Sequence, residues 1–380
     1  MRGHPWHHQH VRYNRVTTAV ALLAALGACT TGEGGPSFNP TPHPTRPGQV
    51  VIIAGDPALN RDARDGEFAL RSSAYGGGGL AVSSDGTVYY RVYFGREGRV
   101  VRLGRDGRVQ LNAVDVVAEQ MIANGHDLWL LGSGPGIAIT KVSFTDWRET
   151  RIVDWTTRVA SKTLKVVDAS GTSFSRHEMD ELYRDWSGAK IFLRADGTPV
   201  IVSTSGRLFE VRGPEKFQEW TPPGYVKALA GVIGGGGFQP QDTVTDEQGQ
   251  SILLGRTGIL YIPRDRPARH VRFPASMATL PPWSAITVTG QESVLLLGGT
   301  TTTQSAPRPT LIRADGRMER LDWGTFKRCP GADGTLAAVA SALPGGVVRT
   351  SDGTIVMNDR RCGQIYAFKL PEKLEGEPLR

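Results

Sequence analysis

The sequence predicts an all-β protein, a six-bladed β-propeller whose last blade is closed by an N-terminal strand. The first observation is a unit of four short apolar strands between residues 80 and 111, joined by polar turns at Asp85-Gly86 and Asp106-Gly107. Asp-Gly between alternating runs is typical of a β-hairpin, because both residues accept a positive φ. The second observation is that similar units recur along the 380 residues. One such sheet cannot bury its own faces, so the copies are expected to pack on one another.

The repeats and their ends predict how the ring closes. Five further units occupy residues 119–155, 190–220, 242–273, 285–323 and 346–370, and the last stops one strand short. Residues 49–54 form a lone apolar run ahead of the first complete unit. We expect this run to pair with the third strand of the last unit, which closes the ring. A β-sandwich is the alternative fold, but it does not account for the repeat or for the incomplete last unit.

The N-terminus has the features of an export signal. Residues 1–15 are basic and rich in His, and residues 16–28 are an apolar run of 13 residues, shorter than the about 20 that span a bilayer. Leu26-Gly27-Ala28-Cys29 resembles the lipobox of bacterial lipoproteins. The resemblance implies a signal peptide at 1–28, lipidation of Cys29 and attachment to the extracytoplasmic side of the cell membrane. An ordinary secretory signal is the alternative.

The rest of the chain divides into a flexible tether at 29–48, the propeller at 49–371 and a C-terminal tail at 372–380. The tether is rich in Gly, Pro and Thr and has no periodicity, as in an extended spacer. Cys329 and Cys362 are the two remaining cysteines, and an even pair in an exported chain predicts a disulfide. Two buried free thiols are the alternative.

Net charge argues against a nucleic-acid partner. The formal charge is +7, and three of the arginines, Arg2, Arg12 and Arg15, lie in the leader, which leaves +4 after cleavage. This charge is small and is dispersed among acidic residues, whereas nucleic-acid binding needs a concentrated basic patch. We therefore expect no nucleic-acid partner and a monomeric protein.

The first unit resembles a known repeat family. The segments GLAVSSDGTVYY (79–90) and GRVVRLGRDGRV (98–109) are similar to an NHL repeat, and residues 51–82 are similar to the segment that precedes the first such repeat in many secreted bacterial proteins. The resemblance covers about half of the chain, is good in the first and last units and is degenerate in the four between. It implies a six-bladed propeller and no single activity.

Loop lengths differ between the two ends of the predicted blades. Turns after first and third strands take two to four residues, whereas connections between units are long, at 55–75, 156–189, 221–241, 274–284 and 324–345. In an up-and-down blade the long connections share a face with the loops that follow second strands, and we call this the elaborated face. The longest connection contains SRHEMDELYRDW (175–186), a predicted helix in which Ser175 and Glu178 form a capping box. We expect its apolar stripe, which includes Trp186, to pack on the propeller; a lid over the channel is the alternative.

Few residues are suited to catalysis or metal binding. His126, His177 and His270 are the histidines after the tether, and none has metal-ligand spacing to another. The related lactonase-like propellers hold a divalent cation with Glu, Asn and Asp near the channel. By unit position, that resemblance offers Glu119, Asn124, Asp242 and Asn358 as ligands of a Ca²⁺ ion, although none sits in a matching motif. We therefore expect no cofactor and no catalytic residue, with calcium as the alternative.

The expected function is non-catalytic binding. Arg, Trp and Tyr are the residues that interfaces favour, and the elaborated face is expected to offer Arg96, Trp186, Trp283 and Arg360 to a protein, peptide or envelope-glycan ligand. The alternative is a metal-dependent enzyme of the lactonase or lyase type with its site at the central channel.

Overall fold

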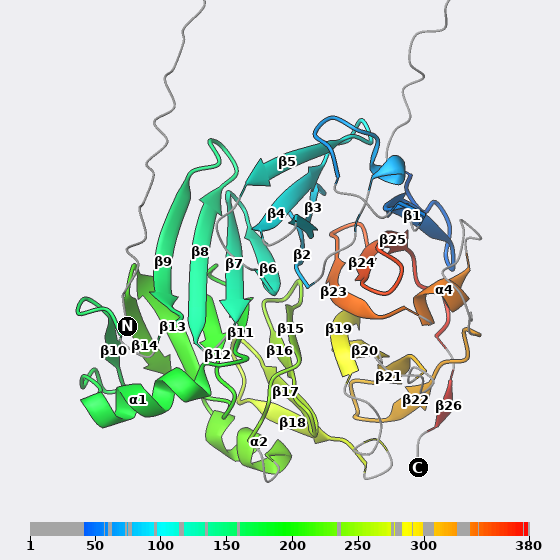
Figure 1. Cartoon of the computed structure of the whole chain (residues 1–380). Helices are drawn as coiled ribbons and strands as arrows, with labels where there is room; N and C mark the ends of the chain where they lie inside the picture. The colour runs from blue at the N-terminus through cyan, green and yellow to red at the C-terminus, as the bar shows by residue number, and fades with distance from the viewer. Residues whose placement is uncertain are drawn as a thin grey trace, which may run out of the picture. The chain divides into compact units, whose positions relative to one another are not determined.

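The computed structural model shows six sheets of four or five strands, almost entirely antiparallel, that follow one another around a ring (Figure 1). It describes residues 42–56, 58–59, 63–72, 74, 78–94, 97–113, 118–133, 136–157, 160–233, 237–274, 277, 283–290, 292–298, 308–324, 335–340, 342–374 and 376–378. The predicted six-bladed β-propeller is therefore confirmed.

The first three blades keep the strand order of the chain. Each begins at the innermost strand and proceeds outward by antiparallel pairing. Their strands are β2 (Leu80–Val82), β3 (Val88–Phe94), β4 (Glu97–Leu103) and β5 (Val109–Ala113) in blade 1; β6 (Gln120–Asn124), β7 (Asp127–Ser133), β8 (Ile137–Ser143) and β9 (Glu149–Trp155) in blade 2; and β11 (Lys190–Leu193), β12 (Pro199–Val202), β13 (Leu208–Gly213) and β14 (Lys216–Trp220) in blade 3.

The last three blades repeat this order. Their strands are β15 (Asp242–Thr245), β16 (Ser251–Leu254), β17 (Gly258–Ile262) and β18 (Arg269–Arg272) in blade 4; β19 (Trp283–Gly290), β20 (Ser293–Gly298), β21 (Thr310–Ile312) and β22 (Met318–Arg320) in blade 5; and β23 (Pro344–Arg349), β24 (Ile355–Asp359) and β25 (Gln364–Phe368) in blade 6. The innermost strands of neighbouring blades contact one another in the order β2, β6, β11, β15, β19, β23 and back to β2, so the ring closes.

The N-terminal strand completes blade 6 as predicted. β1 (Val50–Ala54) pairs antiparallel with β25, with Val50 opposite Phe368 and Ile52 opposite Tyr366. Its alternating side chains serve two different interfaces: Val50 and Ile52 pack toward blade 5, whereas Val51 and Ile53 pack toward blade 1. Side chains on opposite faces of a strand alternate with a period of two, so this single run packs on both sides of blade 6. Its pairing with β25 brings the start of the domain beside its end.

Two more strands extend blades in ways that the repeat does not predict. β10 (Lys165–Val167), from the connection between blades 2 and 3, pairs parallel with β14. β26 (Glu377–Pro378), within the predicted C-terminal tail, pairs with β22 of blade 5. Both lie at the outer edges of their sheets, where unpaired backbone groups would otherwise remain.

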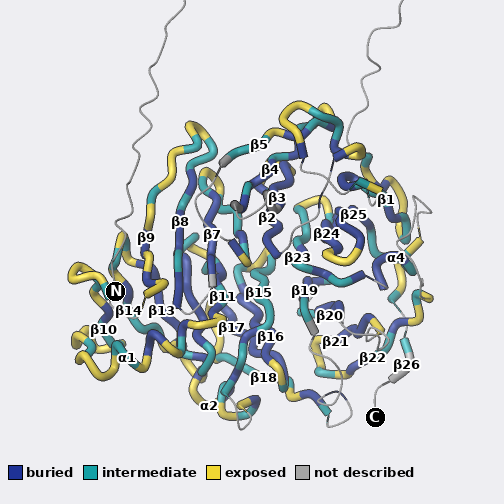
Figure 2. Tube along the Cα trace, viewed as in Figure 1, coloured by how far each residue is buried: buried dark blue, intermediate teal, exposed yellow. Residues whose placement is uncertain are grey.

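The core consists of six apolar clusters, one between each pair of neighbouring blades. The middle strands are buried along their length, as β12, β16, β17, β24 and β25 show, and Figure 2 shows exposed residues mainly at the turns. Short helices contribute to four of these clusters: η1 (Ala69–Arg71), α1 (Arg176–Asp185), α2 (Tyr225–Val232) and α4 (Leu336–Ala340).

The Asp-Gly turns are held by their own side chains. In blade 1, Asp85 accepts hydrogen bonds from the hydroxyls of Ser83 (2.5 Å) and Thr87 (3.0 Å), and from the Thr87 backbone N–H (3.1 Å). In blade 6 the carboxylate of Asp352 binds Thr354 in the same way. These donors hold the pKa of both aspartates below their usual value. The two turns with the best repeat signature therefore share one hydrogen-bond scheme.

None of the helices in the described part of the chain is long and apolar enough to cross a membrane. The predicted signal peptide and Cys29 lie outside the described residues. So does Cys329, while Cys362 is buried at 3% exposure and is disulfide-bonded; its pairing with Cys329 stays a prediction.

Replacing Ile53 in β1 by Ala should destabilise the whole ring. Ile53 is 2% exposed and packs in the cluster between blades 6 and 1, so truncation is expected to cost about 2–5 kcal/mol of unfolding free energy. Chemical denaturation measures the loss. The half-buried Val51→Ala change in the same strand is the control and should cost less; equal losses would contradict ring closure through Ile53.

Candidate functional site

The innermost strands of the blades enclose a cavity, the central channel. It has a volume of about 400 Å³ and is lined by residues from all six innermost strands, β2, β6, β11, β15, β19 and β23. These strands run in the same direction along the channel, so their first residues meet at one end. That end is the mouth on the elaborated face, because each connection between blades leads into it.

Four charged side chains from four blades lie at this mouth. Glu119 directly precedes β6, Lys190 begins β11, Asp242 begins β15, and Arg360 follows β24. All four line the cavity, and Lys190 lies within electrostatic range of the other three. We call Glu119, Lys190, Asp242 and Arg360 the mouth cluster.

Asp242 is fixed by two backbone donors. Its Oδ1 accepts from the N–H of Thr243 (2.8 Å), and its Oδ2 accepts from the N–H of Ile286 in β19 (2.9 Å). Burial nonetheless disfavours the ionised form and raises the pKa of Asp242 to about 6, although the two backbone donors and the charges of Lys190 and Arg360 act in the opposite direction. Asp242 therefore titrates close to neutral pH.

Lys190 is shifted in the complementary direction. Burial in the channel wall lowers the pKa of its ammonium group below the usual value, while Asp242 and Glu119 favour the charged form and Arg360 opposes it. Neither Lys190 nor Arg360 makes an ion pair or a side-chain hydrogen bond with any described residue. The mouth cluster thus contains two cationic groups whose donors remain unused.

Two glycines allow Arg360 to reach the mouth. A methyl group added at Gly345 would lie 2.5 Å from Arg360 Nε, and one added at Gly78 would lie 2.8 Å from Arg360 Nη2. Both distances are too short for a real side chain, so the guanidinium lies directly on the glycine backbones of blades 6 and 1. Gly78, which belongs to the glycine run that begins at residue 76, therefore allows the Arg360 side chain to approach the backbone closely.

A hydrogen-bonded belt stiffens the wall below the mouth. The Gln120 amide pairs with both backbone groups of Ile191 (2.8 and 2.9 Å) and donates to Thr243 Oγ1 (2.9 Å). The Thr243 hydroxyl in turn donates to the Ile191 carbonyl oxygen (2.8 Å). Three innermost strands, β6, β11 and β15, are therefore tied together by side chains, which keeps Lys190 and Asp242 at fixed positions.

The predicted calcium ligands are brought together only in part. Glu119 and Asp242 meet at the mouth, but Asn124 donates to the Gly197 carbonyl oxygen (3.1 Å), and Asn358 accepts from the Gly345 N–H (2.9 Å). In the described part of the chain, no three His, Cys, Asp or Glu side chains are grouped to hold a metal ion. Lys190 and Arg360 already supply positive charge beside the two carboxylates, so this donor set does not fit a calcium ion.

The predicted ligand-face residues have different outcomes. Arg360 is exposed and lines the mouth, as expected. Arg96 and the side chain of Trp283 lie outside the described residues. Trp186 is fully buried, so its placement on the ligand face is wrong.

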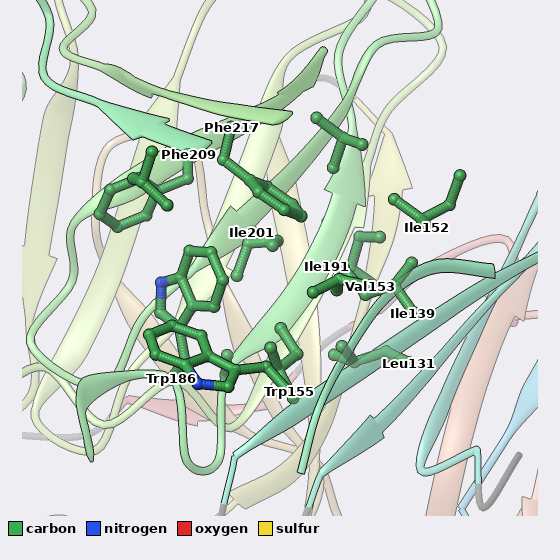
Figure 3. Close-up of a cluster of buried hydrophobic side chains, with 14 of the residues drawn as sticks. Leu131, Ile139, Ile152, Val153, Trp155, Trp186, Ile191, Ile201, Phe209 and Phe217 are labelled. Carbon is green, nitrogen blue, oxygen red and sulfur yellow. The ribbon is translucent and has the colours of Figure 1, made fainter. Parts of the chain in front are cut away.

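Trp186 instead anchors α1 in the cluster between blades 2 and 3 (Figure 3). Its ring centroid lies 5.1 Å from Phe217, 5.4 Å from Phe209 and 5.6 Å from Trp155, with edge-to-face geometry at each. The expected capping box of Ser175 and Glu178 is present at the start of α1. The helix therefore packs on the propeller, and the alternative of a lid over the channel is not supported.

From the sequence, Glu119 and Asp242 were identified by their position in the unit, as candidate metal ligands, and Arg360 as a candidate residue of the ligand face. Lys190 was not identified. Lys190 begins its innermost strand just as Asp242 does. The signal that identifies it is therefore position in the repeat, since first residues of innermost strands converge.

No protein-family model matches the chain, and comparison with curated proteins finds no match. Among solved structures, a protein of unknown function from Bacteroides thetaiotaomicron is similar, with a TM-score of 0.57 and 12% identity over 84% of this chain and 75% of that one. A gluconolactonase from Xanthomonas campestris has a TM-score of 0.47 and 13% identity, covering 86% and 99% of the two chains. The extracellular domain of a two-component system from B. thetaiotaomicron has a TM-score of 0.44 and 11% identity over 86% of this chain, which spans 42% of that one. The similarity to the B. thetaiotaomicron protein of unknown function supports the fold alone, and the NHL resemblance stays an expectation.

Asp242→Asn should change how stability depends on pH. Because the folded pKa of about 6 lies above the usual 3.8, the wild-type fold loses stability as pH rises from about 4 through 6. Relative to the Asn variant, this loss is expected to reach about 3 kcal/mol. Denaturation at pH 4, 5, 6, 7 and 8 measures it. Parallel profiles for the two proteins would show that Asp242 is not perturbed.

Trp186→Ala should weaken the fold without affecting the mouth. Removing this fully buried ring is expected to cost about 3–5 kcal/mol of unfolding free energy. Trp186→Phe should cost less and remain folded, which allows ligand binding to be measured as well. His177→Ala, on the exposed side of the same helix, is the control and should be close to neutral. A loss of binding in the folded Trp186→Phe variant would restore α1 to the ligand face.

Proposed function

We propose that this chain is an extracytoplasmic, lipid-anchored recognition protein that binds a polar ligand at the channel mouth without transforming it. The ligand is the end of an envelope glycan or peptide, small enough for its terminal group to enter the cavity. The observation that carries the proposal is the mouth cluster, four charged groups from four blades around an opening of about 400 Å³. Pockets of this volume with a few convergent polar groups are the usual ligand sites of proteins.

The position of the mouth supports recognition at a surface. The connections between blades lead into the strands that begin at it, and loops on a rigid scaffold are where binding residues concentrate. A lipid at Cys29 followed by a Gly- and Pro-rich tether would hold the propeller close to the membrane with freedom to reorient. Both features suit a ligand that is itself part of the cell envelope.

The second candidate is an enzyme of the lactonase type with its site in the channel. It is favoured by the perturbed pKa values of Lys190 and Asp242, because such shifts concentrate at catalytic sites. The mouth cluster, however, supplies two carboxylates beside two cationic groups instead of an oxygen-rich cation site. Binding of a charged ligand therefore explains the two cationic groups of the mouth cluster, whereas metal-dependent lactone hydrolysis does not.

Narrowing the mouth should weaken the binding of the envelope ligand. We expect Glu119→Trp to reduce binding by at least about tenfold on glycan and peptide arrays built from envelope saccharides and peptides, because the indole occludes the opening. Glu247→Trp is the matched control, since Glu247 is an exposed carboxylate at the opposite end of the same cavity. Binding should survive this second change.

Two outcomes would contradict the proposal. Equal binding by the Glu119→Trp and wild-type proteins would place the ligand elsewhere. Turnover of δ-gluconolactone by the purified protein, abolished by Glu119→Trp, would favour the enzyme.

A further inference from the structure

The mouth cluster contains donors without acceptors. The Lys190 ammonium and the Arg360 guanidinium line the same cavity, and neither has a side-chain partner among the described residues. Arg360 is exposed and Lys190 is partly exposed, so the donors of both groups are open to the channel. An anion that enters the mouth can therefore use them.

Asp242 is not that partner. Both of its oxygens accept backbone N–H groups of Thr243 and Ile286, which hold the carboxylate in the wall between blades 4 and 5. It lies close enough to influence Lys190 and Arg360 electrostatically but forms no ion pair with either. Asp242 thus lowers the charge of the mouth without using the donors of the two cationic groups.

The two carboxylates of the mouth cluster favour a monoanion over a dianion. Glu119 and Asp242 lie within electrostatic range of Lys190, and each carboxylate, when ionised, opposes a second negative charge on the ligand. A dianionic group such as phosphate would be repelled by two neighbouring carboxylates, whereas a single carboxylate can approach the two cationic groups. Arginine, with its planar set of N–H donors, is well suited to a carboxylate.

A third unused polar group lies in the same cavity. Ser284, in β19, lines the channel, and its buried Oγ has no hydrogen-bond partner in the described structure. A buried hydroxyl without a partner costs free energy, and a ligand hydroxyl can recover it if the Ser284 side chain turns toward the channel. An anionic group beside hydroxyl groups is the chemistry of a carboxylated sugar.

We propose that Lys190 and Arg360 bind the carboxylate of a uronic acid unit, whose ring hydroxyls face Ser284 in the channel. This inference rests on the proposed function and specifies the ligand of that same site. Arg360 is held at the mouth by its position on Gly78 and Gly345, and Lys190 is held by the strand β11 that it begins. The two donors therefore meet the carboxylate without rearrangement of the backbone.

Isothermal titration of the full chain with D-glucuronate and D-glucose tests the proposal. Glucuronate should bind at least about tenfold more tightly than glucose to the wild-type protein, because only it offers a charged acceptor. Lys190→Gln and Arg360→Gln should each weaken glucuronate binding about tenfold to a hundredfold and leave glucose binding unchanged. Lys190→Arg keeps the charge and should restore most of the affinity.

Arg361→Gln is the matched control, because Arg361 is an exposed arginine in the same loop that does not line the cavity. It should bind glucuronate like the wild type. Melting temperatures of all variants establish that they are folded. If a glutamine variant fails to fold, Lys190→Met and Arg360→Met supply the same comparison.

Other ligands provide the outcomes that would overturn the inference. Tighter binding of glucose 6-phosphate than of glucuronate would make the site a phosphate site. Tighter binding of N-acetyl-dialanine would assign it to a peptide C-terminus. Equal binding of glucuronate and glucose would remove the role of the two cationic groups. If Glu119→Trp abolishes binding of an array ligand but the wild-type protein does not bind glucuronate, only this inference is contradicted. If Glu119→Trp changes the binding of no array ligand, the proposed function is contradicted as well.

Discussion

The pairing of β1 with β25 is the interaction on which the other features depend. Without it blade 6 would have three strands, and the apolar clusters on both of its sides would lose their outer wall. The residues of β1 alternate between these two clusters, so one strand of five residues stabilises two interfaces at once. Blade interfaces are the whole of the core here, and closing the ring is therefore equivalent to completing the core.

Closure also determines where the charged residues meet. Glu119 and Arg360 are 241 positions apart in the chain, yet both lie at the mouth because each stands at the same end of its own blade. The carbonyl oxygen of Glu119 and the guanidinium of Arg360 both approach Gly78 of blade 1. A side chain at this glycine would clash with the Glu119 backbone and displace the Arg360 guanidinium, so the absence of a side chain at Gly78 is part of the site.

Much of the fold could be predicted because its signals are local. The Asp85 turn, the capping box of Ser175 and Glu178, and the alternating β1 run each depend on residues within a few positions of one another. The site could be predicted only in part. Lys190 has no distinguishing neighbours in the sequence, and its importance arises from strands that only the closed ring brings together. Trp186 was misplaced because the sequence pattern of an apolar stripe is the same whether the stripe packs on a core or binds a ligand. Only the contacts of Trp186 with Phe209 and Phe217 show that it packs on the core.

The two cationic groups remain unpaired for a reason that lies in the backbone. Asp242 acts electrostatically on Lys190, but the backbone N–H groups of Thr243 and Ile286 each donate to one of its oxygens and hold the carboxylate in the wall. Moving the carboxylate to Lys190 would leave at least one of those N–H groups without an acceptor inside the wall, which is as unfavourable as the unpaired cation. The wall thus retains a negative charge that forms no ion pair with Lys190 or Arg360, and the donors of these two groups are open to the channel. A site of this kind would favour one negative charge on the proposed ligand and oppose a second.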